Sequence, residues 1–192
     1  GDINHINTAV KEKTKGFPVS EHIGSTLGKT VLANFPNTEP IQNPSLAVRS
    51  VKITLPLQEV TPEEVADAKN KIDQLGDPKA NFYMKVAAVK ILDLADKGPN
   101  WPSEIQVFRL DSDTAIVGLP CEIFAQLGLA IKAQSPFKKT LVMSICNDRP
   151  SYVPTLKAFQ EGSYEISNAR VKPGTGEIIV ETTVKMLHDI KK

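Results

Sequence analysis

Hydrophobic positions in the first half of the chain predict one strand and a pair of helices. An alternation of apolar and polar residues from Leu46 to Leu57 is typical of a strand. Thr61-Pro62-Glu63-Glu64 predicts a helix start, with Thr61 as N-cap and Glu64 closing a capping box. This helix should stop at Gly76, and a second should run from about Ala80 to Lys97. The two helices are expected to form a hairpin inserted between strands.

The second half of the chain predicts a β-hairpin followed by a strand-helix-strand unit. The hairpin joins Glu104 to Leu110 and Thr114 to Leu119 through a turn at Asp111-Ser112-Asp113. Pro120 should open a helix that ends near Ser135-Pro136, and the run Thr140 to Cys146 should form the next strand. A connection of this length suits a parallel pair. The apolar positions expected on the buried face of the helix are Ile123, Phe124, Leu127, Leu129 and Ile131.

The two ends of the chain complete an α/β prediction. Ser20 is expected to cap a helix that runs to Phe35, and a surface loop follows as far as Pro44. Near the other end we expect a short strand from Tyr164 to Val171 and a last helix from Glu177 to Ile190. The predicted fold is therefore a mixed sheet with a parallel strand-helix-strand unit and flanking helices. At 192 residues, one domain or a large piece of one is expected for residues 1–192.

Three polar side chains come near the carboxyl ends of the two predicted parallel strands, where open α/β sheets place their binding crevices. From spacing alone, Glu122 is an acid in the first turn of a helix, which the helix dipole favours by about 0.3–1 kcal/mol. Tyr152 and Tyr164 are, on the same basis, half-buried aromatic residues whose hydroxyl groups find a partner.

The same segments resemble those of a known enzyme family. VGLPCEIF is similar to the "(I/V)PGEF" corner of the neutral/alkaline, non-lysosomal ceramidases, and CNDRPSYVPT with EGSYE is similar to the stretch that follows it. The resemblance implies a zinc-dependent hydrolase that cleaves the amide bond of ceramide, here as part of a larger catalytic domain. It also implies that Glu122 and Tyr152 bind the Zn²⁺ ion and that Tyr164 steadies the reacting carbonyl group.

The N-terminal residues GDINHI look like the family's GDVSPN loop but differ at two positions. Asn4 stands where the family has its catalytic serine, and His5 stands where it has proline. Asparagine can orient a substrate but cannot act as a hydroxyl nucleophile. His5 is a candidate base or additional zinc ligand, and a solvent-facing loop residue is the alternative.

The family's histidine ligands lie before this loop. We therefore expect the chain to be the C-terminal part of a longer polypeptide, to depend on the missing N-terminal part, and to be inactive alone. Two alternatives stay open: a binding domain that keeps the fold without the chemistry, and a hydrolase of a different lipid amide, peptide-like amide or ester.

Composition excludes some partners. The formal net charge of +1 gives no reason to expect nucleic-acid binding. The sequence has no apolar run long enough for a transmembrane helix and no signal-peptide pattern, and the family resemblance implies a secreted or periplasmic location. Cys121 and Cys146 are either buried free thiols or a disulfide, and without a CxxC spacing a zinc site built on them is less favoured.

Overall fold

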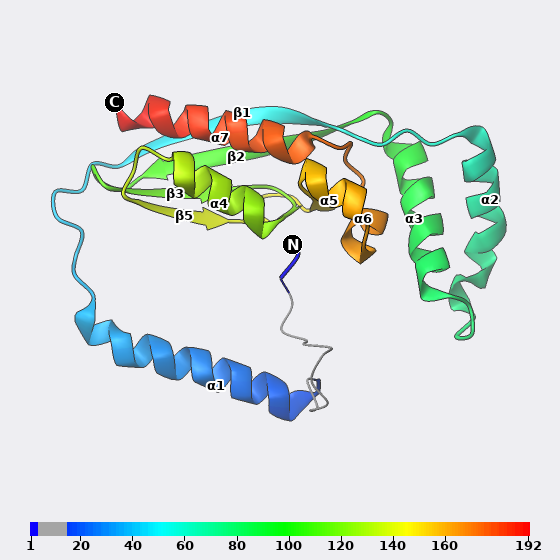
Figure 1. The fold of residues 1–192 in the computed structure, drawn as a ribbon, viewed down its shortest axis with the longest axis horizontal. Helices are drawn as coiled ribbons and strands as arrows, with labels where there is room; N and C mark the ends of the chain where they lie inside the picture. The colour runs from blue at the N-terminus through cyan, green and yellow to red at the C-terminus, as the bar shows by residue number, and fades with distance from the viewer. Residues whose placement is uncertain (4–14) are drawn as a thin grey trace. The chain divides into compact units, whose positions relative to one another are not determined.

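The computed structural model describes residues 1–3 and 15–192, which fall into two compact units. The smaller unit, Ile3–Asn43, holds the helix α1 (Phe17–Asn34) and a single 3-10 turn, η1 (Phe35–Asn37). Helix α1 begins after Gly16, earlier than the expected start at Ser20, because Pro18 fits the first turn of a helix. The larger unit, Gly1–Asp2 with Pro44–Lys192, holds everything else in the described chain (Figure 1).

A four-stranded mixed sheet in the order β1-β2-β3-β5 forms the larger unit. β1 (Ala47–Pro56) pairs antiparallel with β2 (Asn100–Arg109), which pairs antiparallel with β3 (Thr114–Gly118). β5 (Lys139–Met143) then lies parallel to β3. The predicted fold class, including the parallel strand-helix-strand unit, is confirmed.

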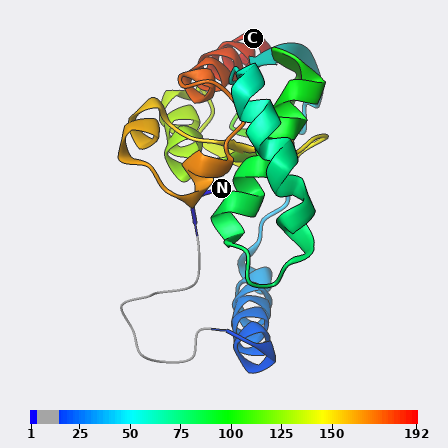
Figure 2. The same ribbon diagram turned by 90° about the vertical axis from the view of Figure 1, so that its right-hand side faces the viewer.

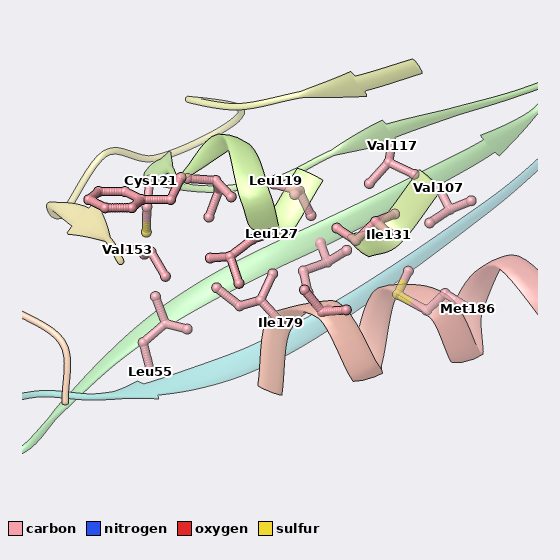
Figure 3. Close-up of a cluster of buried hydrophobic side chains, with 14 of the residues drawn as sticks. Leu55, Val107, Val117, Leu119, Cys121, Leu127, Ile131, Val153, Ile179 and Met186 are labelled. Carbon is pink, nitrogen blue, oxygen red and sulfur yellow. The ribbon is translucent and has the colours of Figure 1, made fainter. Parts of the chain in front are cut away.

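One face of this sheet carries the hydrophobic core. Helix α4 (Ala125–Gln134) packs on β5, and helix α7 (Thr175–Lys191) packs on β1, β2 and α4. Figure 3 shows apolar side chains of both helices meeting those of the strands. Fully buried members of this core are Leu55, Leu57, Ile105, Val107, Val117, Leu119, Ile131, Val153, Val171, Ile179 and Leu187.

The predicted helical hairpin is present as α2 (Pro62–Ile72) and α3 (Phe82–Lys97). The capping box forms as expected: the Glu64 N–H donates to Thr61 Oγ1 at 3.2 Å, and the Thr61 N–H donates to Glu64 Oε2 at 2.7 Å. A 3-10 turn, η2 (Asp73–Gly76), carries the chain to the expected stop. The hairpin lies beyond one end of the sheet, where α3 contacts α6 (Tyr164–Asn168) (Figures 1 and 2).

The prediction was wrong about the start of the helix after β3. Residues Glu122–Ile123 form the short strand β4, which pairs in parallel with β6 (Tyr152–Val153), and α4 begins only at Ala125. The backbone explains the difference, because the N–H groups of Glu122 and Phe124 donate to Ser151 O and Val153 O, at 3.0 and 3.2 Å. Leu129, expected on the buried face of the helix, is exposed.

Two further expectations are corrected. The segment expected as a strand near Tyr164 forms the short helix α6 after another, α5 (Leu156–Glu161), and only Val171 makes a β-bridge, with Leu57. β5 ends at Met143, so Cys146 lies in the following loop; both cysteines are free thiols. Within the described residues, no helix has the length and apolar character needed to cross a membrane.

Candidate functional site

A tight corner between β3 and β4 positions the first residue of the candidate site. Cys121 is fully buried with φ of 69°, in the left-handed region that favours glycine. In the PGEF motif that this segment resembles, glycine stands at the corresponding position. Two residues of the loop after β5, Ile145 and Asn147, also have positive φ. The Ile145 N–H donates to Cys121 O at 2.9 Å, and this hydrogen bond fixes the loop after β5 against the corner. Such backbone conformations persist where the surrounding structure imposes them, and they gather at functional sites.

The β4–β6 pairing places Glu122 directly beside Tyr152, its register partner. The Glu122 side chain is 20 % exposed, and Arg149 Nη1 donates to its Oε1 at 3.0 Å. Burial, together with the negative charge of Glu122 and a hydrogen bond to it, raises the pKa of Tyr152 above its usual value near 10. At neutral pH Tyr152 is therefore an uncharged phenol beside the Glu122 carboxyl group.

Tyr164 lies against Tyr152 within a group of four aromatic rings. Its ring centroid is 6.1 Å from that of Tyr152, in an edge-to-face arrangement. On its other sides it stacks with Phe82 at 6.2 Å and meets Tyr83 at 6.3 Å, both from the first turn of α3. The Tyr164 hydroxyl accepts a long hydrogen bond from Asn168 Nδ2, at 3.5 Å. Within residues 1–3 and 15–192 this hydroxyl donates no hydrogen bond, so its hydrogen can point to a ligand.

A polar pocket of about 350 Å³ opens beside these residues. Trp101 Nε1 donates to Asp148 Oδ2 at 2.6 Å, and Lys97 Nζ lies 4.2 Å from the centre of the Trp101 ring. On another wall Arg170 Nε forms an ion pair with Asp93. The lining residues are Asp93, Lys97, Trp101, Glu122, Asp148, Arg149, Pro150, Ser151, Tyr152, Asn168 and Arg170.

The first two residues of the chain form hydrogen bonds with the backbone of β4 and α4 beside this site. Asp2 Oδ1 accepts a hydrogen bond from the N–H of Ala125, the first residue of α4, at 2.8 Å. The Gly1 nitrogen donates to Ile123 O at 2.7 Å. A Cβ atom on Gly1 would stand 2.4 Å from Glu122 O and 3.2 Å from the Tyr152 ring, so this close approach to β4 requires glycine.

The structure thus brings together three of the five predicted site residues: Glu122, Tyr152 and Tyr164. The other two, Asn4 and His5, lie outside the described residues. Over residues 1–3 and 15–192, no three His, Cys, Asp or Glu side chains come together as a metal-binding group. Glu122 and Tyr152 are therefore the two candidate ligand residues in the described part of the chain.

Sequence reasoning missed the charged residues that surround these three. Arg149 stands in the CNDRPSY stretch just before β6, a position from which it was predictable as a neighbour of Glu122. Asp93 and Lys97 are spaced i, i+4 on α3, which indicates a shared helix face. No local pattern points to Arg170, whose partner is 77 positions away in the sequence.

No protein-family model and no curated protein sequence matches this chain. Among solved structures, the neutral ceramidase from Pseudomonas aeruginosa superposes with a TM-score of 0.61 at 16 % identity, over 96 % of this chain and 35 % of that one. A structure described as ceramidase complexed with C2 matches with a TM-score of 0.43 at 23 % identity, over 47 % of this chain and 15 % of that one. The chain thus spans about a third of the length of the neutral ceramidase, with which it shares a fold.

Proposed function

We propose that this chain supplies part of the catalytic site of a zinc-dependent amidohydrolase of the neutral ceramidase type. The observation that carries the proposal is the pairing of β4 with β6, which sets Glu122 beside Tyr152, with the Tyr164 ring 6.1 Å from that of Tyr152. These are the three residues for which the resemblance implies chemistry. The fold shared with the neutral ceramidase is consistent with this assignment.

In this proposal Glu122 and Tyr152 bind the metal ion through their oxygen atoms. Carboxylate oxygen is an ordinary zinc ligand, whereas tyrosine is an uncommon one whose raised pKa must fall before it binds as phenolate. A nearby cation has this effect on an acidic group. Zinc bound there would lower the pKa of a water molecule to about 7 and polarise an amide carbonyl group.

Beside the metal ligands, Tyr164 has a catalytic role and Arg149 a positioning role. Tyr164 donates a hydrogen bond to the oxyanion that forms when the amide carbonyl is attacked, an interaction whose loss typically costs about 100- to 1000-fold in rate. Arg149 neutralises Glu122 and is 66 % exposed, so it has room to leave the carboxylate when a metal ion arrives. Asn4 orients the substrate, and His5 is a base or an additional zinc ligand. The family's histidine ligands come from upstream polypeptide.

A second candidate function is a binding domain that keeps the fold without the chemistry. The observation that favours it is the replacement of the family's catalytic serine by Asn4. The ion pair between Arg149 and Glu122 is consistent with it, because that carboxylate already has a cationic partner.

The test measures zinc content and release of fatty acid from a short-chain N-acylsphingosine. It uses the polypeptide with its upstream segment, its Glu122→Gln and Tyr152→Phe variants, and Glu161→Gln as a control, since Glu161 pairs with Lys157 on the surface. We expect zinc-dependent turnover that Glu122→Gln abolishes and Glu161→Gln preserves, with weaker zinc binding in Tyr152→Phe. Bound zinc without turnover would indicate another amide or ester substrate. Absence of both zinc and turnover would favour the binding domain.

A further inference from the structure

The sheet has a second face that no helix of its own unit covers. Helices α4 and α7 pack on the other face, where Ile105, Val107 and Val117 are fully buried. Side chains alternate between the two faces of a strand, so the neighbours of these residues point the opposite way. On that opposite face Val48 is 57 % exposed, Leu141 55 % and Met143 54 %.

The strand register aligns the apolar residues of this face into one row. Val48 pairs with Phe108, Phe108 with Ile116, and Ile116 with Leu141, so every strand contributes one member. With strands about 4.8 Å apart, the row is about 14 Å long. We call these four residues the apolar row. Met143, two positions after Leu141 on β5, extends it at one edge.

Polar residues border the apolar row along β1 and β2. Lys52 pairs with Glu104, and Ser50 donates a hydrogen bond to Glu104. Gln106 accepts a hydrogen bond from Asn147 Nδ2 at 3.1 Å. An apolar centre with paired polar residues at its border is the usual composition of a protein interface. Parallel strand pairs such as β3–β5 occur, in addition, mostly in sheets that are covered on both faces, although the antiparallel pairs of this sheet do not require it.

We propose that this face is the docking surface for a further layer of the same domain, supplied by polypeptide that precedes Gly1. The inference rests on the proposed function, in which upstream polypeptide also supplies the histidine ligands. The fold match argues for this occupant, because 96 % of the chain corresponds to only 35 % of the neutral ceramidase. The larger part of a chain with this fold therefore has no counterpart in these residues. The upstream layer buries the apolar row and so completes the core.

Thiol labelling tests the proposal. Leu141→Cys is combined with Cys146→Ser, so that the introduced thiol is the reactive one; burial raises the pKa of Cys121 to about 12, which keeps that thiol unreactive. The matched control is Ile178→Cys on α7, a residue that is 50 % exposed and lies on a helix of the covered face. Each variant is labelled with a maleimide both in the 192-residue chain and in the polypeptide with its upstream segment.

In the 192-residue chain we expect both introduced thiols to react at similar rates. In the longer polypeptide, Leu141→Cys should react at least about tenfold more slowly, because the thiol is reached only through local opening, whereas Ile178→Cys should be unchanged. Val48→Cys serves if Leu141→Cys fails to fold. The readout needs neither zinc nor turnover, so a longer polypeptide without hydrolase activity still tests it.

Three results would overturn the proposal. Equal rates in the two polypeptides would mean that the upstream segment leaves the face uncovered. Protection already present in the 192-residue chain would assign the cover to another part of that chain, or to a second copy where protection rises with concentration. A reading frame with no coding sequence before Gly1 would remove the proposed occupant.

Discussion

The corner at Cys121 gives the sharpest test of how this chain builds its site. Cys121 combines φ of 69° with complete burial, so its backbone favours glycine while its side chain fills part of the core. The informative pair of variants is Cys121→Gly and Cys121→Ala. Both remove the sulfur atom from the core, at a cost on the order of 1 kcal/mol. Their difference therefore reports the backbone conformation together with the burial of the one Cβ atom that alanine keeps, worth about 0.8 kcal/mol.

The size of that difference distinguishes this corner from an ordinary buried position. Where φ is negative, glycine is less stable than alanine by about 0.5–1 kcal/mol. At left-handed φ, a residue with a Cβ atom loses about 1–2 kcal/mol. At Cys121 the left-handed cost of a Cβ atom roughly balances the flexibility of glycine plus the lost Cβ burial, so we expect Cys121→Gly and Cys121→Ala to be equally stable within about 0.5 kcal/mol. Ala115→Gly, at a fully buried strand position of β3, lacks the left-handed term and should lose about 1–2 kcal/mol.

Urea unfolding followed by Trp101 fluorescence measures this difference, because the Trp101 ring lies in the site beside Lys97 and Asp148. With a urea dependence of about 2 kcal/mol per M, Ala115→Gly should lower the midpoint by about 0.5–1 M, whereas the two Cys121 variants should differ by less than about 0.3 M. A Cys121→Gly variant that is less stable than Cys121→Ala by as much as Ala115→Gly loses would refute the reasoning, since the left-handed backbone would then carry no measurable cost.

Three other predictions follow from single contacts. Asp93→Asn should lower the free energy of unfolding by about 1–3 kcal/mol, because the mostly buried Arg170 loses its charged partner. Asp67→Asn, in an exposed pair with Lys71, should lower it by less than about 0.5 kcal/mol in the same urea assay. Equal losses in the two variants would contradict this prediction. Gly176→Ala should destabilise the protein by about 1–3 kcal/mol, because its Cβ would stand 2.9 Å from the backbone oxygen of Pro154 and 2.6 Å from Leu127 Cδ1. Gly128→Ala has ordinary contacts and should gain up to about 1 kcal/mol. Thermal unfolding midpoints compare the two variants, and an undiminished midpoint of Gly176→Ala would contradict the prediction. The pKa of Tyr152, followed by ultraviolet absorbance, should fall in Glu122→Gln, because the negative charge of Glu122 is one of the causes that raise it. An unchanged pKa would show that Glu122 does not raise it. Because the pKa of Tyr152 is raised in the folded state, its contribution to stability is full below pH about 10 and is lost as the pH rises through that folded pKa.

Elements with local signals were predictable from the sequence. The capping box at Thr61 and Glu64, the helix end at Gly98 and the turn at Asp111-Ser112-Asp113 each depend on residues within a few positions of one another. The parallel pairing of β3 with β5 was predictable because a connection of this length, with one helix, has few other geometries. The mixed sheet was predictable from the antiparallel hairpin β2–β3 together with this parallel pair.

The corner after β3 could not be predicted in the same way, because a distant strand decides its structure. Pro120 followed by Cys121 and Glu122 matches the start of a helix, yet the backbone N–H groups of Glu122 and Phe124 bond to Ser151 and Val153. Hydrogen bonds to a segment about 30 positions away leave no local trace. The same holds for Arg170, which becomes part of the pocket only through Asp93 on α3.

This correction changes the physical reason for the position of Glu122. At a helix N-terminus, its carboxylate would be held by a dipole and would point away from the sheet edge with considerable freedom. In β4, Glu122 is instead fixed by a ladder whose partner is Tyr152, so the separation between the two side chains is set by strand pairing. A site built on paired strands holds its groups more rigidly than one built on a loop. Because Gly1, Arg149 and Tyr164 all contact this pair of strands or the side chains that they carry, the short β4–β6 ladder is the element on which the proposed chemistry depends.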